Sequence, residues 1–177
     1  ERPPARRIVE IMRQVAAGLG AIHAIGMLHR DLSPNNIMVL DDGVTKILDL
    51  GLAKTIGAVP SMDSQGTVVG TPNYSSPEQA AGEDVDSRSD LYSLGVVAYE
   101  MVAGHPPFVG PNRVVVSKHI SEQPVTLTRI RPDCPADLGA GIMRALAKSP
   151  NERFQSGSEL RAALGGTPTP VPRFART

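Results

Sequence analysis

Apolar residues recur at helical spacing near the start of the chain. Those that share one face of the segment 4–25, at steps of three and four, are Ile8, Ile11, Val15, Leu19 and Ile22. Gly26 follows and is a typical helix stop. The pattern predicts an amphipathic helix over residues 4–25.

Two short apolar runs come next, at residues 37–40 and 44–48, with Asp41-Asp42-Gly43 between them. Because Asp-Gly is a strong turn signal, the runs are predicted to pair as a β-hairpin. The segment 51–74 has no clear period and is rich in Gly, Ser and Thr. A loop of this length inside a compact domain predicts a functional loop.

Residues 89–103 are apolar on almost every face, which predicts a buried helix. Gly104 ends it, and Pro106-Pro107 prevent its continuation. Weaker helical patterns follow at 111–121, 136–147 and 156–164. We therefore expect one domain over residues 1–164 and a proline-containing tail or linker over 165–177.

The composition narrows the class of protein. A chain of 177 residues with 41% hydrophobic residues can form one packed domain. Its 18 basic and 18 acidic residues exclude a strongly basic nucleic-acid binder, and its single Cys excludes a disulfide framework. No apolar run is long enough for a membrane span. The chain begins with Glu rather than Met, so we expect it to be part of a longer protein.

Three short motifs occur in a fixed order. Residues 29–36, His-Arg-Asp-Leu-Ser-Pro-Asn-Asn, fit the pattern H-R-D-L-x-x-x-N. Asp49-Leu50-Gly51 matches Asp-Phe-Gly with Leu for Phe, and Ser76-Pro77-Glu78 matches Ala-Pro-Glu. With these motifs, residues 5–164 resemble the C-terminal lobe of a bacterial-type serine/threonine protein kinase. The resemblance implies an α+β fold, mostly helical, with the small β-hairpin at the cleft.

The resemblance also implies roles for particular residues. Asp31 would accept or orient the proton of the attacking hydroxyl, and Thr71 would hydrogen-bond near it. Asn36 and Asp49 would bind Mg²⁺, which prefers oxygen ligands, together with the phosphates of ATP. Read without the family, Asp31 could be a solvated cap, Asp49 an Asx turn and Asn36 a cap of the hairpin.

Other matching residues are expected to be structural. The resemblance implies an ion pair between Glu78 and Arg153, and a carboxylate at Asp90 that accepts backbone N–H groups of the catalytic loop. His29 is expected to pack beneath that loop. The remaining histidines lack metal-ligand spacing and are read as ordinary residues; they are His23, His105 and His119.

The sequence departs from the family pattern in two ways. Ser33 stands where such kinases usually carry a Lys that contacts the γ-phosphate, and neither Lys46 nor Lys54 can be assigned to replace it. The glycine pattern G-x-G-x-x-G of the N-terminal lobe occurs nowhere in the chain. We expect this chain alone to be inactive or very weak, and the N-terminal lobe to be its partner.

Regulation is implied by position. Arg30 would bind a phosphorylated residue of the long loop through charge-assisted hydrogen bonds. Thr67 is the first candidate for that residue, and Ser61 and Ser64 are further candidates. The alternative is that these are ordinary loop hydroxyls.

The expected function is transfer of the ATP γ-phosphoryl to a Ser or Thr hydroxyl of a protein substrate, with no nucleic-acid partner. Two alternatives stay open. One is a pseudokinase or orphan lobe that binds partners without catalysis, and the other is a small-molecule phosphotransferase. The resemblance implies a cytoplasmic domain, in a parent that can be membrane-anchored beyond the tail.

Overall fold

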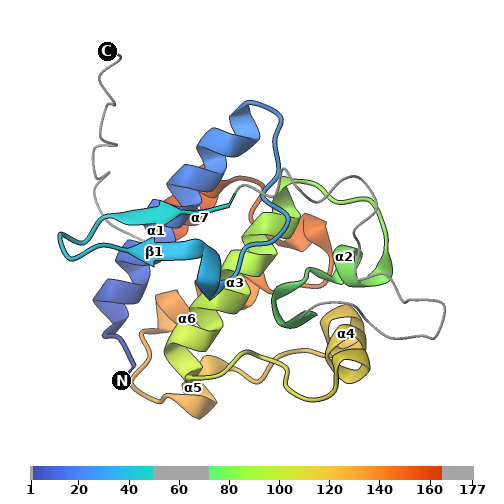
Figure 1. Ribbon diagram of the computed structural model, residues 1–177. Helices are drawn as coiled ribbons and strands as arrows, with labels where there is room; N and C mark the ends of the chain where they lie inside the picture. Colours follow the sequence, from blue (N-terminus) through green and yellow to red (C-terminus); the bar gives the residue numbers. More distant parts are fainter. Residues whose placement is uncertain (1, 50–71, 165–177) are drawn as a thin grey trace.

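The computed structural model describes residues 2–49 and 72–164, and Figure 1 shows their arrangement. The helices are α1 (Ala5–Ala24), α2 (Pro77–Ala81), α3 (Ser87–Ala103), α4 (Asn112–Ser121), α5 (Leu127–Ile130), α6 (Ala136–Ala145) and α7 (Gly157–Ala163). The strands are β1 (Ile37–Val39) and β2 (Thr45–Ile47), and three 3-10 turns are η1 (Pro34–Asn36), η2 (Pro72–Tyr74) and η3 (Pro150–Glu152). This confirms the predicted fold, mostly helical with a small antiparallel hairpin.

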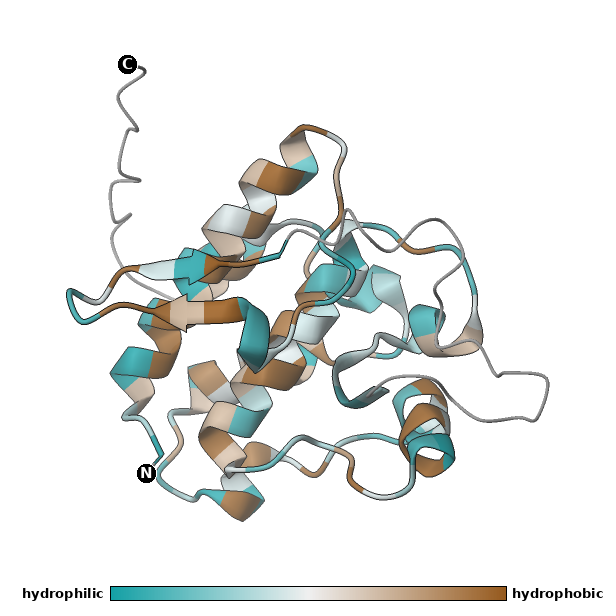
Figure 2. Cartoon of the chain, in the orientation of Figure 1, coloured by the Kyte–Doolittle hydropathy of each residue, from teal (hydrophilic) through white to brown (hydrophobic). Residues whose placement is uncertain are grey.

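Helix α3 runs through the middle of the molecule and packs against α1, α2, α5 and α6 (Figure 1). Figure 2 shows polar residues at its first turn and mostly apolar ones over the turns that follow. It begins at Ser87, earlier than its apolar pattern predicts, because the Asp86 carboxylate accepts a hydrogen bond from the Arg88 N–H at 2.8 Å. The predicted buried helix is confirmed.

Helix α1 covers one side of α3. Its buried residues are Ile8, Ile11, Met12, Val15, Ala16 and Leu19, which lie on the predicted apolar face. Ile22, at the end of that face, is partly buried against the same core. The helix starts after Pro4 and ends before Ile25, within one residue of the predicted range at each end.

The hairpin lies across α1. Its register pairs Ile37 with Ile47, and Gly43 in the turn has a φ of +89°, which favours glycine over any L residue. The Gln14 amide of α1 holds the turn from both sides. Its Nε2 donates to the Gly43 carbonyl at 3.1 Å, and its Oε1 accepts from the Thr45 N–H at 2.8 Å.

The last described helix packs against the first. A Cβ atom added at Gly157, where α7 begins, would overlap the carbonyl oxygen of Ala16 on α1. The same Cβ would lie 3.4 Å from the backbone nitrogen of Gly20. The absence of a side chain at this position therefore allows α7 to approach the α1 backbone.

Helix α2 was not predicted, because five residues are too few to show a helical period. It begins with a capping box, in which the Ser76 hydroxyl accepts from the Gln79 N–H and the Gln79 side chain accepts from the Ser76 N–H. This Ser-x-x-Gln signal is present in the sequence and could have revealed the helix. The short α5 also escaped prediction.

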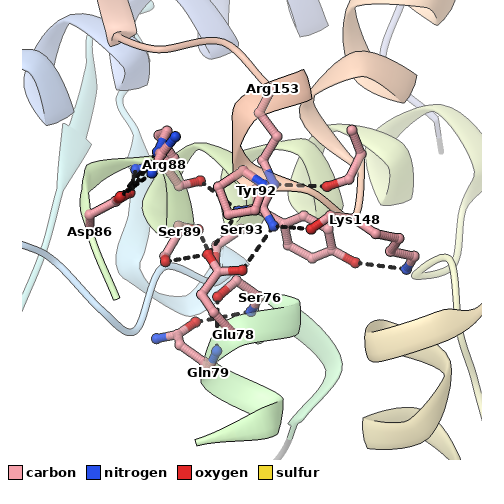
Figure 3. Close-up of polar contacts among 12 residues, drawn as sticks. Ser76, Glu78, Gln79, Asp86, Arg88, Ser89, Tyr92, Ser93, Lys148 and Arg153 are labelled. Atoms are coloured by element: carbon pink, nitrogen blue, oxygen red, sulfur yellow. Dashed lines mark hydrogen bonds and ion pairs between the residues drawn. The ribbon is translucent and has the colours of Figure 1, made fainter. Parts of the chain in front are cut away.

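An ion pair lies in the interior between α2 and the segment that follows α6. Arg153 is 0% exposed, and its guanidinium forms two hydrogen bonds to the Glu78 carboxylate, at 2.7 and 2.8 Å. Its other three N–H groups donate to main-chain carbonyls. These belong to Ala147, Lys148 and Arg88. All five guanidinium donors thus have acceptors, as burial requires (Figure 3).

The Glu78 carboxylate receives further support. The Ser89 hydroxyl of α3 donates a hydrogen bond to one of its oxygens. At the other partner of the ion pair, the Tyr92 ring lies 4.9 Å from the Arg153 guanidinium. Burial raises the pKa of the Glu78 carboxyl, but the hydrogen bonds and charge of Arg153 outweigh it, so this pKa lies below its usual value. The ionised pair joins α2, the start of α3 and the chain after α6.

The predicted tail, 165–177, and most of the predicted long loop lie outside the described residues. Within the described ranges, no helix combines the length and apolar character needed to cross a membrane.

The contact of α7 with α1 gives a first prediction. Replacing Gly157 by Ala should lower the free energy of unfolding by about 1–3 kcal/mol, because the new methyl group meets backbone atoms that cannot rotate away. Urea unfolding followed by circular dichroism measures the change. Gly20→Ala is the matched control, since a Cβ at Gly20 meets no atom within 4 Å. In Gly20→Ala the free energy of unfolding should rise by about 0.5–1 kcal/mol. An equal decrease of the free energy of unfolding in both variants would contradict the packing argument.

The ion pair gives a second prediction, on pH. A carboxyl with a lowered folded-state pKa binds fewer protons in the folded chain than in the unfolded one. The carboxyl therefore stabilises the fold fully at pH values above 4.5, its ordinary pKa. This stabilisation is lost as the pH falls through the lower pKa of the folded chain. Glu78→Gln should lower the free energy of unfolding by about 3 kcal/mol at pH 7. The difference from the natural chain should shrink below pH 4.5.

Urea unfolding at several pH values measures this difference. The control is Glu10→Gln, which removes an exposed pair with Arg7 and should change the stability little at any pH. A Glu78→Gln effect that stays constant down to pH 3 would contradict the assigned pKa direction.

Candidate active site

The Asp90 carboxylate of α3 holds the backbone of the predicted catalytic loop. It accepts hydrogen bonds from the N–H groups of His29 at 2.9 Å and Arg30 at 2.8 Å. Asp90 is 1% exposed, so these bonds form away from solvent. Arg30 has a φ of +65°, an unfavourable conformation for a residue with a side chain. The hydrogen bonds to Asp90 stabilise that conformation.

His23 of α1 completes the surroundings of Asp90, because its Nε2 lies 2.7 Å from an Asp90 oxygen. From its sequence context His23 is predicted to be an ordinary residue. Its link to the loop has no local signal, since His23 and Asp90 are far apart in the chain and only the packing of α1 on α3 brings them together.

His29 connects the two ends of the predicted site. Its ring Nε2 lies 3.0 Å from the Leu48 carbonyl, which can only accept, so Nε2 carries the proton. Nδ1 then accepts from the Asp31 N–H at 3.3 Å. The side chain is fully buried beneath the loop. Through His29, the backbone at Asp31 is tied to the residue that precedes Asp49.

Asn36 fixes the other side of the loop. Its Nδ2 donates to the Asp31 carbonyl at 2.8 Å, and the Asn36 carbonyl accepts from the Leu48 N–H at 2.9 Å. The peptide groups of Asp31 are thus held on both sides, one by His29 and one by Asn36. A side chain on so constrained a backbone is well placed for a reaction that depends on orientation.

These residues line an open pocket of about 360 Å³. The lining residues are Arg30, Asp31, Leu32, Ser33, Asn35, Asn36, Tyr74 and Ser75. The loop forms one wall, and the last residue of η2 with the residue after it, Tyr74 and Ser75, forms the other. Ser33, the departure from the kinase pattern, lines the pocket, whereas the exposed Lys46 of β2 is not among its described lining residues.

The second wall is anchored to α3. The Ser93 hydroxyl donates to the Tyr74 carbonyl at 2.7 Å, and the Tyr74 hydroxyl donates to Glu100 at 2.6 Å. Burial, followed by the hydrogen bond to Glu100, raises the pKa of Tyr74. Tyr74 therefore stays a neutral donor at physiological pH.

Gln79 joins α2 to the catalytic loop and was not singled out in the sequence. Its Nε2 donates to the Arg30 carbonyl at 2.8 Å, while its Oε1 accepts from the Ser76 N–H at 2.9 Å. One side chain thus caps its own helix and holds the loop. The capping-box signal predicts only the first of these contacts.

Asn36 and Asp49 fit the predicted binding of Mg²⁺ in chemical type. Since the Asn36 Nδ2 is engaged with Asp31, its Oδ1 is the oxygen left to act as a ligand. Asp49 follows β2 with a φ of +47°. Mg²⁺ is commonly bound by one or two protein oxygens together with water and phosphates. In the described residues there is no cluster of three His, Cys, Asp or Glu side chains that could hold a metal without such help.

Several residues considered for the site or for its regulation lie outside the described residues. They are Leu50, Gly51, Lys54, Ser61, Ser64, Thr67 and Thr71. The structure therefore brings together Asp31 and Asn36 from the first motif, and links them through His29 and Leu48 to Asp49 of the second.

Comparison with known proteins agrees with this arrangement. The model of the protein kinase domain family matches residues 3–158. The serine/threonine-protein kinase PknB of Mycolicibacterium smegmatis is 42% identical over 161 residues, which cover 90% of this chain and 26% of that protein. PknA of Corynebacterium glutamicum is 41% identical over 181 residues, which cover 97% of this chain and 37% of that protein.

A solved structure is also similar. The kinase domain of Mycobacterium tuberculosis PknI superposes with a TM-score of 0.67 at 30% identity, over 93% of this chain and 56% of that domain. The chain thus spans only 26% and 37% of the length of these two curated relatives and just over half of the solved kinase domain. Because the family model covers most of the chain, and residues of the first motif line one pocket, the chain belongs to the protein kinase domain family.

Proposed function

We propose that this chain is the substrate-side half of a serine/threonine protein kinase domain. The protein that contains it would transfer the γ-phosphoryl group of ATP to a Ser or Thr hydroxyl of a protein substrate. The observation that carries the proposal is the pocket in which Asp31 and Asn36 meet, on a loop held by the buried Asp90.

Asp31 would accept or orient the proton of the attacking hydroxyl. Its backbone is held by His29 on one side and Asn36 on the other, so little reorganisation is needed when substrate binds. Phosphoryl transfer depends mainly on such positioning and on neutralising charge. Thr71, from the long loop, would hydrogen-bond near Asp31 as in the family pattern.

ATP and Mg²⁺ are the implied cofactors. Asn36 through Oδ1 and Asp49 through its carboxylate would hold the metal, which would neutralise phosphate charge when bound. Because the donor is ATP, the proposal places the domain in the cytoplasm.

A protein substrate is favoured over a small molecule by the way the second wall is built. Tyr74 and Ser75 form that wall, and α2 follows directly, anchored by the buried pair of Glu78 and Arg153. We infer that a peptide chain would bind along this wall, opposite Asp31.

Ser33 supports a second candidate, a pseudokinase that binds partners without catalysis. Its hydroxyl lines the pocket but carries no charge to meet a γ-phosphate. Asp31, Asn36 and Asp49 favour the catalytic reading, because all the acidic and amide groups of the motif are present.

We also propose that activity requires an N-terminal kinase lobe as partner. The 177 residues contain no G-x-G-x-x-G pattern to cover the phosphates of ATP. By itself the chain would be inactive or very weak.

The proposal predicts activity when the chain is joined to a suitable lobe. A chimera with the N-terminal lobe of the M. smegmatis relative should transfer phosphate from labelled ATP to a generic basic protein, whereas residues 1–177 alone should not. Asp31→Asn should lower the rate of the chimera by about 10²- to 10⁴-fold, because proton acceptance is lost while shape is kept.

The matched control is Asp41→Asn, in the exposed turn of the hairpin, which should keep full activity. A folded chimera that binds ATP but transfers no phosphate would favour the pseudokinase. Activity that survives Asp31→Asn would exclude the assigned role of Asp31. Transfer to aminoglycosides rather than to protein would favour the small-molecule enzyme.

Regulation by phosphorylation extends the proposal. Arg30 lines the pocket and is exposed, so its guanidinium is accessible to a phosphate group. Thr67 is the first candidate to carry that phosphate. The new charge-assisted hydrogen bonds would order the loop for substrate.

Phosphopeptide mass spectrometry of the active chimera should find phosphate at Thr67. Thr67→Ala should then lower the rate about tenfold, as Arg30→Gln should, because either change removes one partner of a charge-assisted hydrogen bond. Finding no modification between residues 55 and 71 in an active preparation would refute this part of the proposal.

A further inference from the structure

His119 of α4 lies fully buried between two polar groups from separate parts of the chain. Its Nε2 is 3.0 Å from the carbonyl of Asn73 in η2, and its Nδ1 is 2.9 Å from the hydroxyl of Tyr92 on α3. A carbonyl can only accept, so Nε2 carries the proton. Nδ1 of the neutral ring therefore accepts from the Tyr92 hydroxyl.

Lys148 fixes the direction of this chain of hydrogen bonds. Its ammonium group has three donors, and three acceptors surround it: the Tyr92 hydroxyl at 3.4 Å, the Lys118 carbonyl at 3.2 Å and the His119 carbonyl at 2.8 Å. Figure 3 shows Lys148 directed at the Tyr92 hydroxyl. Because the Tyr92 oxygen accepts from Lys148, its own proton is directed at His119.

The two carbonyls that Lys148 contacts belong to the last turn of α4, and the Lys118 carbonyl also accepts from the Glu122 N–H that caps the helix, at 2.9 Å. Lys148 thus anchors the helix that carries His119 as well as the ring that orients it. The Phe108 ring packs edge-on against His119, with ring centroids 5.0 Å apart, and closes the remaining side.

The charge states agree with this geometry. Burial, and then the charge of Lys148, lower the pKa of His119 to about 4, so the ring is neutral at pH 7. Burial and the charge of Arg153 lower the pKa of Lys148 to about 8, which leaves it mostly protonated at that pH. Burial raises the pKa of Tyr92, which keeps its hydroxyl proton.

The chain of hydrogen bonds ends at the pocket. Asn73 is followed by Tyr74 and Ser75, which line the wall opposite Asp31. His119 holds the Asn73 carbonyl from α4, and Ser93 holds the next carbonyl, that of Tyr74, from α3. Two successive carbonyls of the wall are therefore fixed by donors from two helices.

We propose that His119 is a positioning residue for the protein substrate, which holds the wall at Asn73–Ser75 in place while Tyr92 and Lys148 set its tautomer and orientation. The inference rests on the proposed kinase function. Since the wall is on the peptide side of the pocket, loss of the His119 hydrogen bond should weaken use of the protein substrate more than use of ATP.

Kinetics of the two-lobe chimera test the inference. His119→Leu fills a similar volume but cannot donate, and should raise the KM for a peptide substrate about tenfold, the usual effect of one lost buried hydrogen bond. The KM for ATP should change less than about twofold. His119→Gln, which can place an amide N–H near the position of Nε2, should recover most of the loss.

His105→Leu is the matched control, because this histidine is exposed and does not line the pocket. It should leave both KM values unchanged. A His119→Leu variant with unchanged peptide KM, or one in which kcat and both KM values worsen together while Gln fails to rescue, would overturn the proposal and leave His119 as a packing residue.

Amide hydrogen exchange of the 177-residue chain separates this inference from the proposed function. His119→Leu should speed exchange at residues 73–76, with recovery in His119→Gln, whether or not the chimera is active. If the chimera that retains His119 turns over no substrate, the proposed function fails. The Kd for the peptide then replaces KM as the readout. Unchanged exchange at the wall, or unchanged peptide Kd, would still overturn the role of His119.

Discussion

The buried guanidinium of Arg153 is the constraint on which much of this structure depends. A guanidinium has five N–H donors and no acceptor, so every one of its N–H groups needs an acceptor in the interior. Glu78 and three main-chain carbonyls meet that need, and they come from α2, from the start of α3 and from the segment after α6. Helix α2 is thereby fixed in the position from which Gln79 reaches the Arg30 carbonyl.

The backbone of the irregular segments around the pocket is held by side chains on regular helices, and all of these except Gln79 are buried. Asp90 and Gln79 bind the catalytic loop, while Ser93 and His119 bind the opposite wall. Loops near an interior cannot leave their N–H and C=O groups unpaired, and here the partners are side chains rather than other strands. The same contacts that satisfy the backbone also preorganise the groups that face the pocket.

The sequence predicts those elements and residues that show a periodic apolar pattern, a turn signal or a family motif. Helices α1 and α3 and the hairpin follow from apolar spacing and from Asp-Gly, and the family motifs identify Asp31 and Asn36 by type and spacing. Helix α2 is too short to show a period. The contact of His119 with Tyr92 could not be predicted, because it joins α4 to α3, and neither residue stands in a local pattern that requires the other.

The close approach of α7 to α1 has a consequence for how the protein is made. Helix α1 emerges from the ribosome before the other described helices, but the helix that packs along its backbone at Ala16 is the last described one to be synthesised. Joining them closes a loop that contains most of the residues of this chain, which is slow because its entropy cost precedes any gain from contact. Until Gly157 has emerged, α1 keeps apolar surface uncovered. Nascent chains of this protein should therefore expose a chaperone-binding apolar surface on α1 until α7 has emerged.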